Sequence, residues 1–262
     1  MPKKSETNSE NKKDRTIAGD HSSELLHYLL HRRSVPRKKL SYPGPTEGEV
    51  KQILEASSRV SDHGKMMPFW FSVINDNNKD EFEQVLINSM KAYNEKNKDK
   101  DKDKDKDKNK KKDKYKNEDD KLERKAGKLM SAPLIIAVIS SPRRESIPAW
   151  EQFMSVGAAC QNLVLAANAL GYGVNWLTEW YSYDEYVRQA MHLEDHENIA
   201  GFFFIGTAGE VPEDRDRPEV DEITTFWSPD ASQLRKGQKY IEKKDKKDKG
   251  RKGFSLGQRF DG

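Results

Sequence analysis

Residues 150–173 read WEQFMSVGAACQNLVLAANALGYG, the longest stretch of the chain without a charge once Glu151 is passed. Apolar side chains recur most of the way round a helical wheel, and Gly and Ala fill the gaps between them. A helix that is apolar all round has no face for solvent, so the pattern predicts a helix buried in the core or against another subunit. Gly171 and Gly173 mark its end. Gln161, Asn162 and the polarity of the rest of the chain argue against a membrane span.

The composition divides the chain into packed and solvated parts. Of 262 residues, 34% are hydrophobic and 35% charged, so a good part of the chain is not packed core. A single cysteine excludes an intramolecular disulfide and a cysteine-only metal cluster. No apolar stretch follows the polar N-terminus, so we expect no secretory signal and a cytoplasmic protein.

Charge runs set the expected domain limits. We expect a disordered polar tail over residues 1–21, one folded domain over 22–228 and a Lys-rich tail over 229–262. From about residue 96 to 120 the chain is nearly pure Lys, Asp and Asn. Alternating opposite charges have no apolar face to bury, which predicts a solvated insertion in a surface connection.

Helical and extended patterns alternate along the folded part. Leu25, Leu26, Leu29 and Leu30 form one stripe of a helix that begins near Ser22 or Ser23, and Thr46 with Glu49 forms a capping box before another. We expect strands at FWFSVI (69–74), LIIAVIS (134–140) and IAGFFFIGTA (199–208), a short extended segment at GVNWLTEW (173–180) and a helix over 183–193. This order predicts an α+β fold with three layers.

Few residues offer chemistry of their own. There is no GxGxxG, Walker or GxSxG motif and no zinc spacing. Two His pairs, 27/31 and 192/196, are four residues apart but have no evident third ligand, so we expect no metal. Arg32, Arg33 and Ser34 place two guanidinium groups and a hydroxyl at a helix end, which suits a phosphate. Bonding of these arginines to the last helix carbonyls explains the tripeptide equally well.

The loop from Arg59 to Met67 adds a cation, an imidazole and two methionines just before a buried strand. Such a mixture suits a flat ligand that is partly apolar and partly anionic. Loops beside packed elements are where binding residues usually lie.

Five segments then occur in one order: RRS (32–34), SRVSDHGKMMPFWFSVI (58–74), the stretch from PAWEQF to LTEW (148–180), IAGFFFIGTA (199–208) and an arm with RDRP (215–218) that ends at Trp227. Together they resemble the nitroreductase family of flavin enzymes, in its small, minimal branch of NAD(P)H nitroreductases. The resemblance covers about residues 27–227, apart from the insertion.

The resemblance implies a three-layer α-β-α sandwich with a central antiparallel or mixed sheet. It also implies an obligate homodimer with FMN at the subunit interface, around the uncharged helix. The activity it implies is hydride transfer from NAD(P)H through the flavin to a nitroaromatic, a quinone or a similar acceptor. No side chain need be catalytic, because the cofactor carries the redox chemistry.

The family's flavin contacts map onto three segments and the arm. The resemblance implies that Arg32, Arg33 and Ser34 bind the flavin phosphate and ribityl chain. It also implies that Arg217 is a further cation on the phosphate side. The resemblance brings Arg59 and His63 to the flavin from the partner subunit. It sets the backbone of Trp176, Leu177 and Thr178 against the isoalloxazine ring.

Two residues depart from the family pattern. Glu179 stands where the branch often has a small residue, and a carboxylate near a reduced flavin is unfavourable unless it points away. Pro36 stands where some relatives carry a cation, for which Arg37 or Lys65 could substitute.

Other functions fit part of the sequence. A flavin fold could serve dehalogenation or flavin breakdown, and no added lid motif supports either. A binding module could contact nucleic acid through the Lys-rich tracts. The insertion alternates Lys with Asp and has almost no aromatic residue for base stacking, so we do not expect nucleic acid as a partner.

Overall fold

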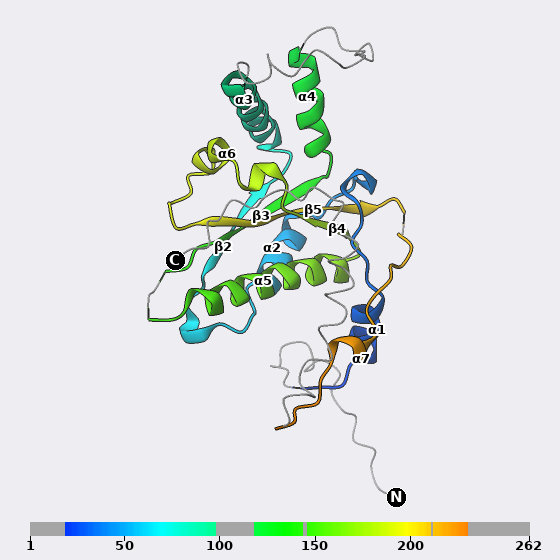
Figure 1. Cartoon of the computed structure of the whole chain (residues 1–262). Helices are drawn as coiled ribbons and strands as arrows, with labels where there is room; N and C mark the ends of the chain where they lie inside the picture. Colours follow the sequence, from blue (N-terminus) through cyan, green and yellow to red (C-terminus); the bar gives the residue numbers. More distant parts are fainter. Residues whose placement is uncertain (1–18, 98–117, 144–145, 211, 230–262) are drawn as a thin grey trace, which may run out of the picture. The chain divides into compact units, whose positions relative to one another are not determined.

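The computed structural model describes residues 19–97, 118–143, 146–210 and 212–229 (Figure 1). Most of the expected N-terminal tail, the centre of the Lys/Asp insertion and nearly all of the expected C-terminal tail lie outside the described residues. The chain divides into two compact units, Met1–Pro212 and Glu213–Gly262. All the strands belong to the first unit, and the second contributes the short helix α7 (Val220–Ile223).

The centre of the first unit is an antiparallel five-stranded sheet. Its strands are β1 (Leu40–Ser41), β2 (Phe69–Ile74), β3 (Leu134–Ser140), β4 (Gly173–Leu177) and β5 (Asn198–Ala208). The order is β1-β5-β3-β2, and β4 also pairs with β5. Every residue of β3 is buried, as the continuous apolar run LIIAVIS predicts.

Helices cover both faces of the sheet (Figure 1). On one face, α2 (Glu47–Ser57) and α5 (Ala149–Ala169) pack against inward side chains such as Val138 and Phe203. On the other, α3 (Lys79–Asn97), α4 (Glu118–Leu129) and α6 (Glu185–Ala190) pack against side chains such as Phe202 and Phe204. Neighbouring residues of β5 thus point into opposite cores, as the two-residue period of a strand requires. The predicted three-layer α+β fold is confirmed.

The helix ends follow local chemistry. Ser22 caps α1 (Ser23–His31) by accepting a hydrogen bond from the Leu25 N–H, and the predicted capping box of Thr46 and Glu49 begins α2. The helix expected over 183–193 is shorter in the structure, where α6 runs only from Glu185 to Ala190. Beyond it the chain turns, and His192 adopts a left-handed conformation with φ of 56°.

Three short 3₁₀ turns complete the first unit: η2 (Arg37–Lys39), η3 (His63–Lys65) and η4 (Trp180–Ser182). None of the described helices is long and apolar enough to cross a membrane.

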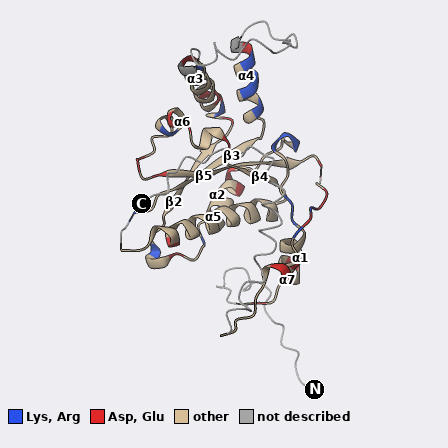
Figure 2. Cartoon of the chain, in the orientation of Figure 1, with Lys and Arg blue, Asp and Glu red and all other residues tan. Residues whose placement is uncertain are grey.

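The uncharged helix is buried on only one side within this chain. Ala159, Cys160 and Leu163 of α5 are fully buried, whereas Trp150 and Met154 are 59% and 65% exposed. Figure 2 shows α5 free of charge colours along almost its whole length. The sequence predicted a helix buried either in the core of one chain or against another subunit. Burial of all its faces in the core of one chain is ruled out, so contact with another subunit is the alternative that remains. The four leucines of α1 are also 47–62% exposed.

Candidate functional site

The Arg32–Ser34 tripeptide lies beside the sheet. One guanidinium N–H of Arg32 donates to the Ser34 hydroxyl at 3.3 Å, and Arg33 is half-buried. The Arg32 Nε is buried and has no hydrogen-bond partner among the described residues. Just after the tripeptide, the Val35 N–H donates to the Val174 carbonyl of β4 at 2.9 Å. This bond fixes the tripeptide next to the outer edge of β4.

The outer edge of β4 is open beyond this bond. In a strand, the N–H and C=O of one residue point to the same edge, and those of the residue two positions on do so again. Because Val174 bonds outward to Val35, the backbone of Trp176 also points outward. Among the described residues, no strand other than β5 pairs with β4. Trp176 therefore presents backbone donor and acceptor groups to a ligand, and the exposed Thr178 follows directly.

The Trp176 side chain flanks this edge in a defined position. Its indole stacks on Phe203 with ring centroids 5.1 Å apart, and its Nε1–H donates to the Ala200 carbonyl at 3.3 Å. The indole lies directly over Gly201, where an added Cβ would sit only 2.1 Å from Nε1. Glycine is required at 201 because the ring covers its backbone.

Glu179 is paired. Its carboxylate lies 3.6 Å from the Arg37 guanidinium, and Arg37 also lies over the Phe204 ring. Arg37 and Lys65 were the two candidates for the cation that some relatives carry at position 36. Arg37 is the one that lies beside this edge, and its partner is Glu179, the carboxylate that departs from the family pattern. Lys65 belongs to η3 in the 59–67 loop.

The 59–67 loop is fastened to α5 by polar side chains of that helix. Asn162 donates to the Arg59 carbonyl at 2.9 Å, and the Ser155 hydroxyl donates to the loop backbone at 3.0 Å. His63 Nδ1 lies 2.6 Å from a Glu151 carboxylate oxygen. The first two bonds hold the loop backbone and the third holds the His63 ring, and the side chains of Arg59 and His63 are exposed.

The predicted site residues form two groups in one chain. His63 lies against Glu151 near the start of α5, whereas Val35 lies beside Val174, just past its end. The 18 residues from Glu151 to Ala169 rise about 27 Å at 1.5 Å each. Val35 and the β4 edge lie just past the C-terminal end of α5, whereas the 59–67 loop follows the helix from Asn162, which is bonded to Arg59, to Glu151, which lies against His63.

Arg217 belongs to the second unit, Glu213–Gly262. There its guanidinium donates to Asp214 at 3.1 Å, and its side chain is exposed. Its predicted role as a phosphate-side cation stays a prediction.

A model of the nitroreductase family ("Nitroreductase family") matches residues 29–207, more than half of the chain. The chain belongs to the nitroreductase family. It is 30% identical over 185 residues to "Putative NAD(P)H nitroreductase YdjA" of Escherichia coli K12, covering 70% of this chain and 88% of that protein. The family is one of oxidoreductases, so the protein is a nitroreductase-type enzyme.

Solved structures agree on the fold. The nitroreductase-like family protein from Bacillus cereus matches with a TM-score of 0.60 and 17% identity, over 80% of this chain and 99% of its own. A variant of the FMN and NADPH-dependent nitroreductase NfnB from Sphingopyxis sp. strain HMH matches with a TM-score of 0.56 and 16% identity, over 78% and 98%. The nitroreductase-like α-β-α architecture is thereby confirmed.

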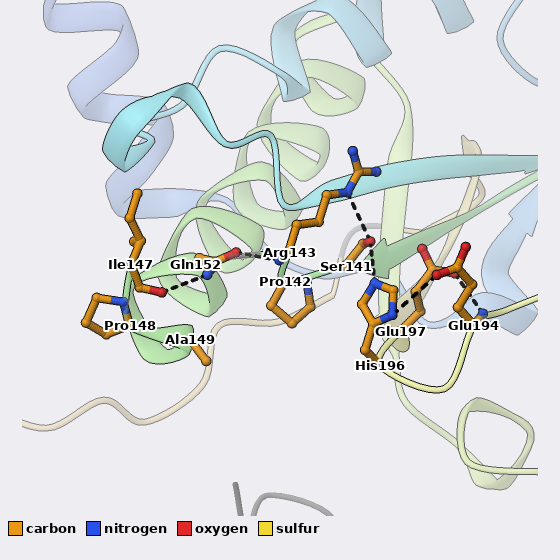
Figure 3. Close-up of a pocket in the computed structure, with 10 residues that line it drawn as sticks. All are labelled: Ser141, Pro142, Arg143, Ile147, Pro148, Ala149, Gln152, Glu194, His196 and Glu197. Atoms are coloured by element: carbon orange, nitrogen blue, oxygen red, sulfur yellow. Dashed lines mark hydrogen bonds and ion pairs between the residues drawn. The ribbon is translucent and has the colours of Figure 1, made fainter. Parts of the chain in front are cut away.

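A cavity of about 650 Å³ lies elsewhere in this nitroreductase, at the N-terminal end of α5 (Figure 3). None of the predicted site residues lines it. The Ser141 hydroxyl lies 3.4 Å from His196 Nε2, and Arg143 Nε donates to the same hydroxyl at 3.4 Å. Ser141 is only 1% exposed, so its oxygen is a bonded structural group and not an available nucleophile.

Glu197 anchors the wall of this cavity. It is 7% exposed and accepts hydrogen bonds from the Trp70 indole at 2.7 Å and the Glu194 N–H at 3.1 Å. Burial by itself would raise the pKa of this carboxyl, but the hydrogen bonds outweigh burial and lower it. Among the described residues, no three His, Cys, Asp or Glu side chains are grouped to hold a metal ion.

Sequence reasoning missed the residues that hold the 59–67 loop. Glu151, Ser155 and Asn162 are three of the few polar residues in a mostly apolar helix. Their spacing of four and seven residues puts them on one helix face, a signal that was available in the sequence.

Proposed function

We propose that this nitroreductase is an FMN-dependent oxidoreductase that uses NAD(P)H. The observation that carries the proposal is the open outer edge of β4 at Trp176, to which the segment after Arg32–Ser34 is bonded through Val35. The edge offers backbone hydrogen-bond groups for a flavin ring, and the buried, unpartnered Arg32 Nε belongs to the segment that Val35 bonds to β4, where the family expects the flavin phosphate. The residues present therefore fit FMN. The names of relatives support both reactants, NAD(P)H for the Escherichia coli protein and FMN with NADPH for NfnB.

The roles of the chain's own residues follow from their positions. Arg32, Arg33 and Ser34 would bind the phosphate and ribityl chain, and the backbone from Trp176 to Thr178 would bind the edge of the ring. Arg217 would add a further cation on the phosphate side. Bound FMN would supply the redox chemistry by accepting a hydride from NAD(P)H and passing it to the acceptor.

We propose a homodimer in which each site takes the β4 edge from one chain and the 59–67 loop from its partner. About 27 Å of α5 separates His63 from the tripeptide end of the helix within one chain, so His63 would meet the tripeptide only across a subunit interface, and we propose that Arg59 of the same loop does so too. The exposed Trp150 and Met154 of α5 supply an apolar surface for that interface. We also propose residues 22–228 as the catalytic domain, with 96–120 as an insertion.

The acceptor we propose is a nitroaromatic, a quinone or a similar compound. The purified protein should be yellow, and chromatography of the heat-released cofactor should identify FMN. NADH and NADPH should each be tested for bleaching of the flavin absorption without oxygen, and nitroaromatics and quinones for restoring it. Bound FAD, or no flavin after reconstitution, would contradict the proposal. Turnover of halogenated aromatics, or loss of the flavin itself, would favour dehalogenation or flavin breakdown.

A further inference from the structure

Arg37 and Glu179 border the open edge of β4 from its two ends. Arg37 follows Val35, which is bonded to the edge, and Glu179 follows Thr178, the last residue of the proposed flavin-facing segment. The two side chains meet at 3.6 Å, although 141 intervening residues separate them in the sequence. The fold has thus placed one cation and one anion together at the border of the site.

Arg37 is held on three sides. Its guanidinium lies 4.9 Å from the Phe204 ring centroid, 3.5 Å from the Tyr181 hydroxyl and 3.6 Å from the Glu179 carboxylate. Its side chain is only 17% exposed. A cation over an aromatic face and beside a carboxylate has a fixed position, so its charge is directed at Glu179.

Tyr181 is influenced by both charges of the pair. It is 2% exposed, and its pKa is raised, first by burial and then by the charge of Glu179, while Arg37 opposes the rise. The phenol therefore stays neutral and serves as a hydrogen-bonding wall. The only opposite charges in this group are those of Arg37 and Glu179.

We propose that Arg37 is a positioning residue that neutralises Glu179 and keeps its carboxylate off the open edge of β4. The inference rests on the proposed function. An uncompensated carboxylate next to the β4 edge would oppose the electron density that reduction adds to bound FMN, whereas a neutral pair does not. A carboxylate at position 179, where the family branch often has a small residue, is tolerated because Arg37 neutralises it.

The test compares four proteins: the parent, Arg37→Met, Glu179→Gln and the double variant. Met keeps an apolar stem over Phe204 and removes the charge. The readouts are the dissociation constant of oxidised FMN and the reduction potential of bound FMN, measured by equilibration with reference dyes. Lys38→Met is the matched control, because it removes the same charge from the neighbouring, exposed position.

We expect Arg37→Met to free the Glu179 carboxylate toward the β4 edge and so to weaken binding of reduced relative to oxidised FMN by roughly tenfold, the scale of the carboxylate charge about 10 Å from the flavin at an effective dielectric constant of about 20. For a two-electron couple, tenfold lowers the potential by about 30 mV. In the Glu179→Gln background, the same substitution should shift the potential by less than half as much. Lys38→Met should leave it nearly unchanged.

Equal shifts in both backgrounds would show that Arg37 acts on the flavin independently of Glu179 and would overturn the proposal. If the parent binds no FMN, the proposed function fails and this inference with it. If Arg37→Met does not fold, Arg37→Lys replaces it. This variant keeps the charge but loses the contacts with Tyr181 and Phe204. It should lower the reduction potential less in the Glu179→Gln background than in the parent. An equal effect again overturns the proposal.

Discussion

The position of Trp176 should depend on the absence of a side chain at Gly201. An added Cβ would lie 2.1 Å from Nε1, 2.5 Å from Cδ1 and 3.3 Å from Cε2 of the indole, all inside ordinary contact distance. The close atoms are the ring itself, so Gly201→Ala must displace the indole. Displacement loses the bond to the Ala200 carbonyl, worth about 1 kcal/mol, and the stacking on Phe203, worth about 0.5–1.5 kcal/mol.

We therefore expect Gly201→Ala to lower the free energy of unfolding by about 1.5–2.5 kcal/mol and to weaken FMN binding, because the displaced ring borders the β4 edge. Urea unfolding at one fixed protein concentration measures the first effect, and titration with FMN measures the second. Gly48→Ala is the control. A Cβ at that exposed position of α2 meets no atom within 4 Å, and alanine there should stabilise the helix by about 0.5–1 kcal/mol.

A double-mutant cycle decides the cause. In a Trp176→Ala background the ring is gone, so Gly201→Ala should cost less than about 0.5 kcal/mol. The same cost with and without the indole would refute the steric explanation. A harmless Gly201→Ala in the parent would show that the ring does not lie over this backbone.

Four further expectations follow from single features. Met154→Lys should shift the dimer to monomers in light scattering, because it puts a charge on the apolar face of α5, whereas Gln84→Lys on α3 should not; dimers in both would exclude this face as the interface. Arg33→Ala should weaken FMN binding about tenfold to a hundredfold while the circular dichroism spectrum is kept, and unchanged affinity would contradict the phosphate role. Because the folded-state pKa of Glu197 is lowered, its contribution to stability is present above the unfolded-state pKa and is lost as pH falls through the folded-state pKa. The parent should therefore exceed Glu197→Gln in free energy of unfolding by less at pH 3 than at pH 6. A difference that stays constant over this range would refute the expectation. Burial raises the pKa of the Cys160 thiol to about 12, so it should react with a thiol reagent at pH 8 only after denaturation, and prompt reaction of the native protein would show that α5 opens.

Local patterns in the sequence were sufficient for the elements and layers. The apolar runs at 69–74, 134–140 and 199–208 became β2, β3 and β5, and the capping box of Thr46 and Glu49 begins α2 as predicted. Strand period, helix period and caps depend on residues within a few positions of one another, so they can be read without knowledge of the fold. The motifs that carry the family resemblance were visible in the same way.

The end of α6 was not predictable from periodicity. Apolar spacing extends to Leu193, but the helix stops at Ala190, and the chain then turns through His192. The Arg188 guanidinium donates to the Glu197 carbonyl at 2.6 Å, a contact that ties the segment after the helix back onto it. Tertiary contacts of this kind override weak local preferences.

The sequence by itself determined the layers, the uncharged helix and the residue types of the site. Only the tertiary structure decided that Val35 occupies part of the β4 edge and leaves Trp176 open, that Arg37 meets Glu179, and that the length of α5 separates the tripeptide from His63. The reason is physical: helix and strand periods are local, whereas the pairing of charges and strand edges far apart in the chain is set by how the layers pack.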